Sequence, residues 1–393
     1  MAPLGVAAQE PPKLLIESIV VEGVPQAAGQ RIVADETLLK VGQTYTESEL
    51  RQAVYRVRRL PFVVNADFSL RKGEHDGYDL LLQVIEETPV FLSAGTNGQR
   101  AQQFDGLAGR NRTTTAWQQF GSLGGRTFVG SSGLVEGSVE KLQHQEGELV
   151  RADYQQFDLF GAGTVAGGGL DSIQGVKGSD QLQASLFGGI PLTAAQSLRA
   201  TLFWSDSRQS AFNQTFKSMD RGAELSWLYN TTDDPLFPMS GSSGFVDGLY
   251  ERDTSHDRQS FEGEQFNRSV VTDVRSLSAG ITHYFPVAAH QSLSLAANVD
   301  RTAFSAEGAS NVPWQYTLAV GHAITLLGFD RTHRFGDLRF ENSVVATYNY
   351  LEATSGFSSR SSRDGSFVSS LVYRSRWGVL RAMLTYSGLW RSH

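Results

Sequence analysis

The sequence predicts a mainly β protein in two parts: a small α+β domain over residues 14–89, then a transmembrane antiparallel β-barrel over residues 90–393. No apolar run reaches the ~18–20 residues that a membrane-spanning helix needs. Helix-like patterns occur only before residue 90. Beyond it, segments of roughly 9–13 residues carry an apolar residue at every second position, which is typical of a barrel. Residues 1–13 are expected to form a flexible N-terminal segment, too short and polar for a complete secretory signal.

The composition excludes several classes of chemistry. The 393 residues carry a formal charge of -7, and this mild acidity argues against nucleic acid as a partner. There is no cysteine, which excludes disulfides and thiolate sites. No histidines form a close metal pair, residues 161–169 lack the Lys-Ser/Thr of a P-loop, and no G-x-S-x-G motif occurs. We therefore expect no catalytic activity, no cofactor, no metal and no nucleotide.

The first domain is expected to follow the order β-α-α-β-β. A strand covers residues 16–21, a short helix residues 31–40, and a second helix begins at Thr46. Glu49 stands three residues after Thr46, the spacing of a capping box. The apolar residues of this second helix share one face at a 3.6-residue period: Leu50, Ala53, Val54, Val57 and Leu60.

A hairpin completes this domain. Pro61 ends the second helix because proline lacks the N–H that a helix interior requires. Two strands follow, over residues 62–70 and 78–85, and the connection between them is short enough for a hairpin turn. A helix pair lying on a three-stranded sheet is thus predicted.

In the second part each strand has one apolar and one polar face. A soluble β-sandwich alternates in the same way, so a large soluble β protein remains an alternative. Strands close to the ~9–11 residues of a tilted membrane strand favour the barrel. So do aromatic residues near the strand ends, where a membrane girdle would lie: Trp204, Trp227, Tyr229, Tyr284, Phe285, Tyr348, Tyr350, Trp377 and Trp390.

Fourteen strands can be placed with the alternating pattern, and residues 314–324 could add another. A bacterial barrel made from one chain is expected to have an even number, so fourteen to sixteen strands are predicted. The connections at residues 98–111, 207–219 and 253–271 are long and polar. We expect them at the end of the barrel away from the small domain, with compact turns at the other end.

The first part resembles a POTRA domain, the periplasmic module of the Omp85 superfamily. The matching segments are Val21-Glu22-Gly23 and residues 41–46, 60–63 and 84–89, although the family usually has Asn where this chain has Val24. The resemblance implies that a sheet edge accepts a client strand by β-augmentation. The expected edge strand begins with Phe62, Val63 and Val64.

Residues 230–241 resemble the turn motif of BamA/TamA-like barrels, D-x-R-D-N-P-L-F-P-x-x-G. Two prolines would make this hairpin rigid, and glycine would permit its exit conformation. Three positions depart from the motif: its first Asp, its Arg and its Asn. The structural turn residues are expected to be Asp233, Asp234, Pro235, Pro238 and Gly241.

Barrels of this superfamily also carry a long loop that folds into the lumen with an Arg-Gly-Phe/Tyr tip. The equivalent here is Leu326-Leu327-Gly328-Phe329, in which the arginine is absent. An Arg–carboxylate pair could pin such a loop bidentately, and solvated loop charges are the alternative. The residues concerned are Gly328, Phe329, Arg331 and Arg334 at the tip, with Asp337 and Glu341 as partners.

The resemblance covers nearly the whole chain and implies sixteen strands. It also implies a bacterial outer-membrane protein that assists insertion or translocation of other proteins, with the POTRA domain in the periplasm. Implied partners are outer-membrane lipid, lipopolysaccharide, and an unfolded client β-barrel or secreted protein, with no nucleic acid or nucleotide. A dedicated secretion pore for one partner protein, a passive diffusion channel and a soluble β-rich enzyme remain alternatives.

Overall fold

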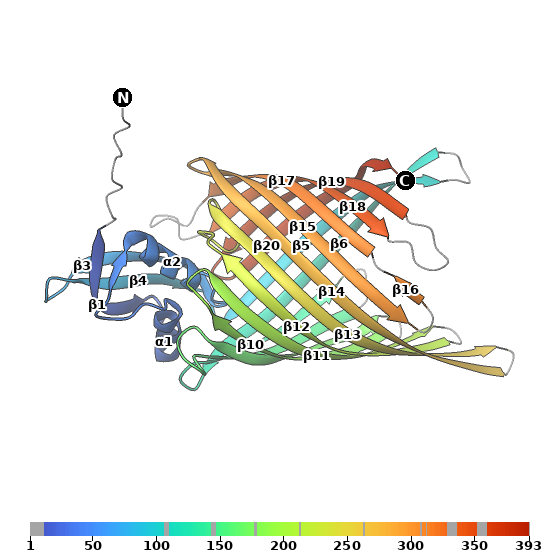
Figure 1. The fold of residues 1–393 in the computed structure, drawn as a ribbon, viewed down its shortest axis with the longest axis horizontal. Coiled ribbons are helices and arrows are strands. Elements are labelled where there is room, and N and C mark those ends of the chain that lie inside the picture. Colours follow the sequence, from blue (N-terminus) through green and yellow to red (C-terminus); the bar gives the residue numbers. More distant parts are fainter. Residues whose placement is uncertain are drawn as a thin grey trace, which may run out of the picture.

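A small sheet with two helices lies against one end of a large barrel of inclined strands (Figure 1). No helix among the described residues is long and apolar enough to cross a membrane. The computed structural model describes residues 12–105, 110–142, 147–176, 179–211, 214–261, 264–306, 309–311, 313–327, 336–351 and 360–392.

We call residues 12–89 the α/β unit. Its sheet has the order β2-β1-β4-β3, in which β1 and β4 run parallel. The predicted order β-α-α-β-β is confirmed, with the short β2 in addition. Its elements are β1 (Lys13–Glu22), α1 (Ala27–Glu36), β2 (Thr44–Thr46), α2 (Glu47–Val57), β3 (Val63–Lys72) and β4 (Tyr78–Glu86).

Helix α1 begins and ends four residues earlier than the predicted range of 31–40. It ends where Thr37 Oγ1 bonds back to Ala34 O and Leu38 adopts a φ of 58°, a conformation that stops a helix. Helix α2 agrees with its prediction: Thr46 Oγ1 accepts from Glu49 N, and Thr46 N donates to Glu49 Oε2 at 2.7 Å. All five predicted apolar positions of this helix are buried in the core of the unit.

Fifteen strands of the described chain form the barrel, within the predicted range of fourteen to sixteen. The possible strand at residues 314–324 lies within β17. A further short strand, β16 (Ala309–Asn311), pairs only with β15. The barrel strands are β5 (Val90–Asp105), β6 (Arg110–Val129), β7 (Gly133–Leu142), β8 (Gly147–Phe157), β9 (Val165–Val176), β10 (Ser179–Pro191), β11 (Gln196–Ala211), β12 (Gln214–Asn230), β13 (Gly241–Phe261), β14 (Glu264–Ala288), β15 (Gln291–Ala306), β17 (Pro313–Leu327), β18 (Asp337–Leu351), β19 (Arg360–Ser375) and β20 (Gly378–Ser392).

The barrel closes through a parallel pair, β20 with β5, while every other neighbouring pair in the described barrel is antiparallel. An odd number of strands that alternate in direction makes the first and last run the same way. The expected even number, and the sixteen implied by the resemblance, are therefore not met in the described residues. We call the closing pair the seam, and the end of the barrel that faces the α/β unit the near end.

The alternation separates two faces as predicted. The outward residues are apolar and exposed, and Leu186 and Leu318, for example, are 66% and 63% exposed. The alternate residues of the same strands face the lumen and are mostly polar or small. Tyr284 is an exception to the predicted girdle. Its register places it on the lumen face, where it lines a cavity with Arg339 and Glu341.

The predicted long loops are mostly strand. Residues 207–211 and 214–219, 253–261 and 264–271, and 98–105 with 110–111 continue strand ladders, so the polar sequence extends the strands beyond the apolar band. The prediction was wrong because alternating hydrophobicity marks only the part of a strand with a dry face. Backbone ladders continue among polar side chains without it.

The core of the α/β unit is continuous with the near end of the barrel. Leu134 and Phe157 belong to the same buried cluster as the helices and sheet of the unit. The Phe128 ring of β6 meets the Phe62 ring edge-on, with 4.9 Å between ring centroids. The unit is thus packed against the barrel by apolar contacts, in addition to the covalent linker.

Substitution Phe128→Ala is expected to loosen this packing by about 2–3 kcal/mol, because it removes a large ring from a shared core. Limited proteolysis should then cut between the α/β unit and β5 faster than in the parent protein. Phe203→Ala, which removes a lumen ring remote from the unit, is the matched control. Equal cleavage rates in both variants would contradict the shared core.

Candidate functional site at the near end

The turn between β12 and β13, residues 231–240, is rigid because its own carboxylates hold it. Asp234 Oδ1 accepts from the N–H groups of Leu236 and Phe237 at 2.8 and 2.7 Å. Asp233 Oδ1 accepts from Met239 N at 2.9 Å. Gly241 has a φ of 98°, and a Cβ there would lie 2.4 Å from Thr231 O. The carboxylates of Asp233 and Asp234 and the glycine at 241 therefore hold this turn in one conformation.

Arg374 of β19 binds this turn from the lumen wall. Its Nη1 and Nη2 each lie 2.9 Å from one carboxylate oxygen of Asp234, a bidentate pair, and its Nε lies 3.0 Å from Asp337 Oδ2. Burial favours a higher pKa for Asp234, but Arg374 and the turn N–H groups outweigh it and hold the pKa below its usual value. We call Asp234, Arg374 and Asp337 the turn lock.

Arg339 of β18 supports the same turn from the other side. Its side chain is buried, and its Nη2 donates to Pro238 O at 2.9 Å and to Ser292 Oγ at 3.2 Å. Its Nε lies 2.9 Å from Glu341 Oε1. The Phe237 ring has the guanidinium carbon of Arg374 4.7 Å from its centroid and that of Arg339 5.7 Å from it.

The two carboxylates predicted as loop partners form ion pairs with arginines of the barrel strands. Asp337 binds Arg374, and Glu341 binds Arg339. The predicted tip residues Gly328, Phe329, Arg331 and Arg334 lie outside the described residues, so their pairing stays a prediction. Sequence reasoning missed Arg339 and Arg374, although both stand on the polar parity of strands that it had placed.

The turn is also tied to the α/β unit. At the C-terminal end of α2, Arg58 Nη1 donates to Asp233 O at 2.6 Å, and Arg59 Nη2 donates to Asn230 O at 2.8 Å. The unit, the turn and the wall strands β18 and β19 therefore form one connected network of hydrogen bonds and ion pairs.

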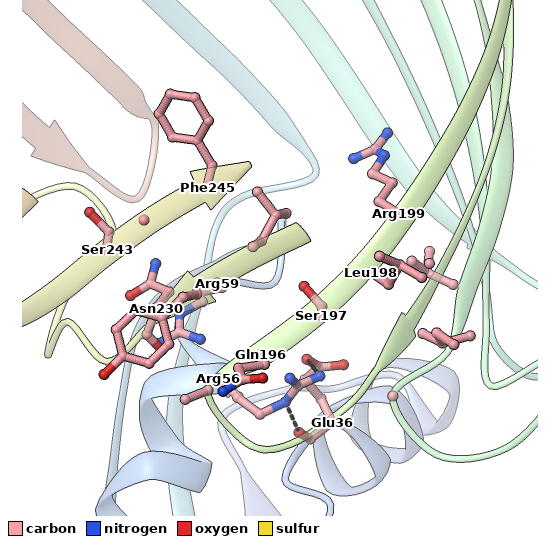
Figure 2. Close-up of a pocket in the computed structure, with 18 of the residues that line it drawn as sticks. Glu36, Arg56, Arg59, Gln196, Ser197, Leu198, Arg199, Asn230, Ser243 and Phe245 are labelled. Atoms are coloured by element: carbon pink, nitrogen blue, oxygen red, sulfur yellow. Dashed lines mark hydrogen bonds and ion pairs between the residues drawn. The ribbon is translucent and has the colours of Figure 1, made fainter. Parts of the chain in front are cut away.

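A cavity of about 510 Å³, which we call the vestibule, lies between the α/β unit and the barrel wall (Figure 2). The unit contributes Glu36, Arg56 and Arg59, and the wall contributes Arg199 and Phe245, among others. Glu36 Oε1 and Arg56 Nη2 lie 2.6 Å apart, both largely buried. The vestibule has a volume within the ~300–1,000 Å³ range of ligand pockets.

Buried charge shifts the pKa of groups at this interface. Burial raises the pKa of Glu36 to about 7, against the attraction of Arg56, and nearby Asp158 raises it further. Burial likewise raises the pKa of Asp158, in the turn between β8 and β9, to about 6, with Asp35 of α1 as a second cause. Arg59 has its pKa lowered to about 10, mainly by burial and then by Arg56.

The linker to the barrel is fixed beside the seam. Thr88 N donates to Arg376 O at 2.9 Å, and Leu92 N donates to Trp377 O at 2.7 Å. Gly378 has a φ of 129°, and a Cβ there would lie 2.0 Å from Leu92 O. Only glycine fits where β20 begins this close to β5. The seam pairs residues 380–387 with 94–101, a shorter pairing than any other between neighbouring described barrel strands.

Strand β3 lies at the edge of the small sheet, as expected. However, Phe62, Val63 and Val64 are buried, because the start of this edge faces the barrel. Farther along, side chains occupy backbone groups of the strand. Asn65 Oδ1 accepts from Ala66 N, Asp67 Oδ1 accepts from Phe68 N, and Arg58 Nε donates to Ala66 O at 2.7 Å.

No protein-family model matches this chain, and no curated protein matches it. Solved structures that are similar in outline include BamA from Haemophilus ducreyi lacking POTRA domains 1–3 (TM-score 0.46, 13% identity, covering 95% of this chain and 80% of that one). CdiB from Acinetobacter baumannii gives a TM-score of 0.40 at 8% identity, covering 92% and 70%. A loop L8 deletion mutant of OmpT from Vibrio cholerae gives 0.36 at 12%, covering 71% and 98%. Each likeness is too distant to carry an argument.

Substitution Arg374→Met should lower the free energy of unfolding by about 3–5 kcal/mol, since it removes a buried cation that forms an ion pair with both Asp234 and Asp337. The measurement is the temperature at which the folded barrel band converts to the unfolded band on a detergent gel. Arg151→Met is the matched control, because the Arg151–Asp171 pair is half-exposed and should contribute under ~1 kcal/mol. A control shift as large as that of Arg374→Met would refute the turn lock.

The α/β unit should lose stability as pH rises from about 4.5 to about 7. The pKa of Glu36 is raised on folding, so the folded state binds the extra proton and is favoured at low pH. The contribution is up to about 3 kcal/mol. Hydrogen exchange of peptides from α1 and α2 measures it, and Glu36→Gln should remove most of the pH dependence. An unchanged pH profile in that variant would assign the effect to another group.

Proposed function

We propose that this chain is an outer-membrane protein of the Omp85 type that assists the insertion or translocation of other proteins. In this proposal the barrel spans the bacterial outer membrane, and the α/β unit is a POTRA domain on the periplasmic side. The protein acts without catalysis, and its partners are membrane lipid, lipopolysaccharide and an unfolded client protein.

The observation that carries the proposal is the surface of the barrel. Large apolar side chains face outward and are exposed on strand after strand, far beyond the few hundred Å² of apolar patch that soluble monomers tolerate. A closed sheet leaves no unpaired edge to lipid, which is what a membrane requires of strands. Outward examples, each from a different strand, are Leu123, Leu170, Leu186, Leu202, Leu225, Leu277, Leu295, Leu318 and Leu384.

Aromatic and apolar side chains at the two ends support a membrane position. Trp227 and Tyr229 stack at the near end, with 6.2 Å between ring centroids. Trp314, Tyr316 and Tyr348 form a second stacked group toward the other end. The near-end turns also expose apolar side chains: Phe160, Leu192 and Trp377.

The short seam and the docked unit support a role with client proteins. A seam with little pairing is the part of the wall that separates at the lowest cost in hydrogen bonds. The turn motif, through which the chain resembles BamA/TamA-like barrels, joins the α/β unit to the wall by Arg58, Arg59 and Arg374. A client reaching the near end would meet the unit, the turn and the vestibule together.

Deleting the gene and measuring the outer-membrane proteome tests the function. Loss of many β-barrel proteins would support insertion, and loss of one secreted protein would support a dedicated secretion pore. An unchanged proteome together with a large, steady conductance in a planar bilayer would overturn the proposal in favour of a passive channel.

Substitution Leu202→Arg tests the lipid-facing exterior. An arginine near the bilayer midplane costs about 2–4 kcal/mol, so less folded barrel should be recovered from the outer-membrane fraction. Thr201→Arg is the matched control, because Thr201 is the neighbouring residue and faces the lumen opposite Glu224. If both variants reach the membrane equally, the outward face does not touch lipid.

A further inference from the structure

We propose that the vestibule is a binding site for acidic segments of an extended polypeptide, a specificity that deepens the proposed function and rests on it. Carboxylates of such a segment would bind Arg59 and Arg199, and its apolar side chains would contact Phe187 and Phe245.

The first argument is charge. Of the three arginines that line the vestibule, only Arg56 lies within ion-pair distance of a carboxylate of the described residues, that of Glu36. Neither Arg59 nor Arg199 forms an ion pair within the described part of the chain, and Arg59 Nε is a buried donor without a hydrogen-bond partner. Arg59 is also attracted by Glu36, but the lining then carries three arginines against one carboxylate, and this excess of positive charge favours an anionic ligand.

The second argument is the apolar surface beside these charges. The guanidinium carbon of Arg199 lies 4.2 Å from the centroid of the Phe187 ring, which orients the cation and leaves its edge available. Phe187 lies over Gly167, and Phe245 lies over Gly280, where a Cβ would come within 2.7 and 2.5 Å of the respective ring. Glycine at both positions lets the rings lie flat on the wall and keeps the cavity open.

The third argument is position. Figure 2 shows Arg56 and Arg59 on the α/β unit and Arg199, Ser197 and Phe245 on the barrel strands around one space. Elsewhere the lumen wall carries clustered carboxylates, such as Asp220 with Asp253 and Glu251. An acidic segment would therefore be attracted to the vestibule and repelled by much of the remaining lumen.

The probe is a short fluorescent peptide in which aspartate alternates with leucine, and its counterpart is the same peptide with lysine in place of aspartate. Binding is measured by anisotropy on the full chain in lipid nanodiscs. The acidic peptide should bind and the basic one should not, with affinity falling as salt rises. Arg199→Gln and Arg59→Gln should each weaken binding at least tenfold.

Two matched controls separate the vestibule from the lumen in general. Arg151→Gln removes the same charge from a paired lumen site and should leave the affinity within twofold. Phe203→Ala removes a lumen ring that lies over Gly222 outside the vestibule, and should have less effect than Phe245→Ala. Hydrogen exchange of α1 and α2 reports whether Arg59→Gln keeps the α/β unit docked.

Equal binding of both peptides, or equal losses in Arg199→Gln and Arg151→Gln, would overturn the vestibule site. Either result leaves the proposed function standing if Leu202→Arg and gene deletion behave as expected. If those two tests fail while the vestibule still binds the acidic peptide and not the basic one, the proposed function is wrong and the binding site remains.

Discussion

A sheet that must have no free edge imposes the central constraint on this fold. With fifteen strands alternating in direction, closure is possible only if the first and last strands pair in parallel. That pair must form without a connecting hairpin to set its register. Two other features set the register where this pair begins. The linker bonds to the turn before β20, and Gly378 permits the close approach to Leu92.

The turn lock extends this fixing across the near end. Asp234, Asp337 and Arg374 are buried together, and such a triad gives little net stability over an apolar core but is strongly destabilising when broken. The main effect of the triad is therefore to position the turn against the barrel wall. The placement of the turn that brings these three charges together also sets the carbonyl groups of Asn230 and Asp233 where α2 binds them. The geometry of the vestibule follows from it.

The sequence predicted the α+β order, the capping box at Thr46, the outward parity of the barrel strands and the rigid turn. Each of these depends on local spacing, so one chain segment contains the signal. It could not predict the partner of Asp234, because Arg374 is 140 residues away and nothing in the spacing of β19 specifies what its lumen face meets. Nor could it distinguish polar loops from polar strand extensions, since hydrophobic alternation disappears in both.

The near half and the far half of the seam are held differently. At the near end Thr88, Leu92 and the turn residues Arg376 and Trp377 add backbone bonds to the pairing. Toward the other end, β5 and β20 continue to residues 105 and 392, but their described pairing stops at 101 and 387. Separation of the two strands therefore costs fewer hydrogen bonds from the far end inward. At the near end, strand separation would also require breaking the bonds of Thr88 and Leu92 to the turn before β20, so opening from that end costs more hydrogen bonds.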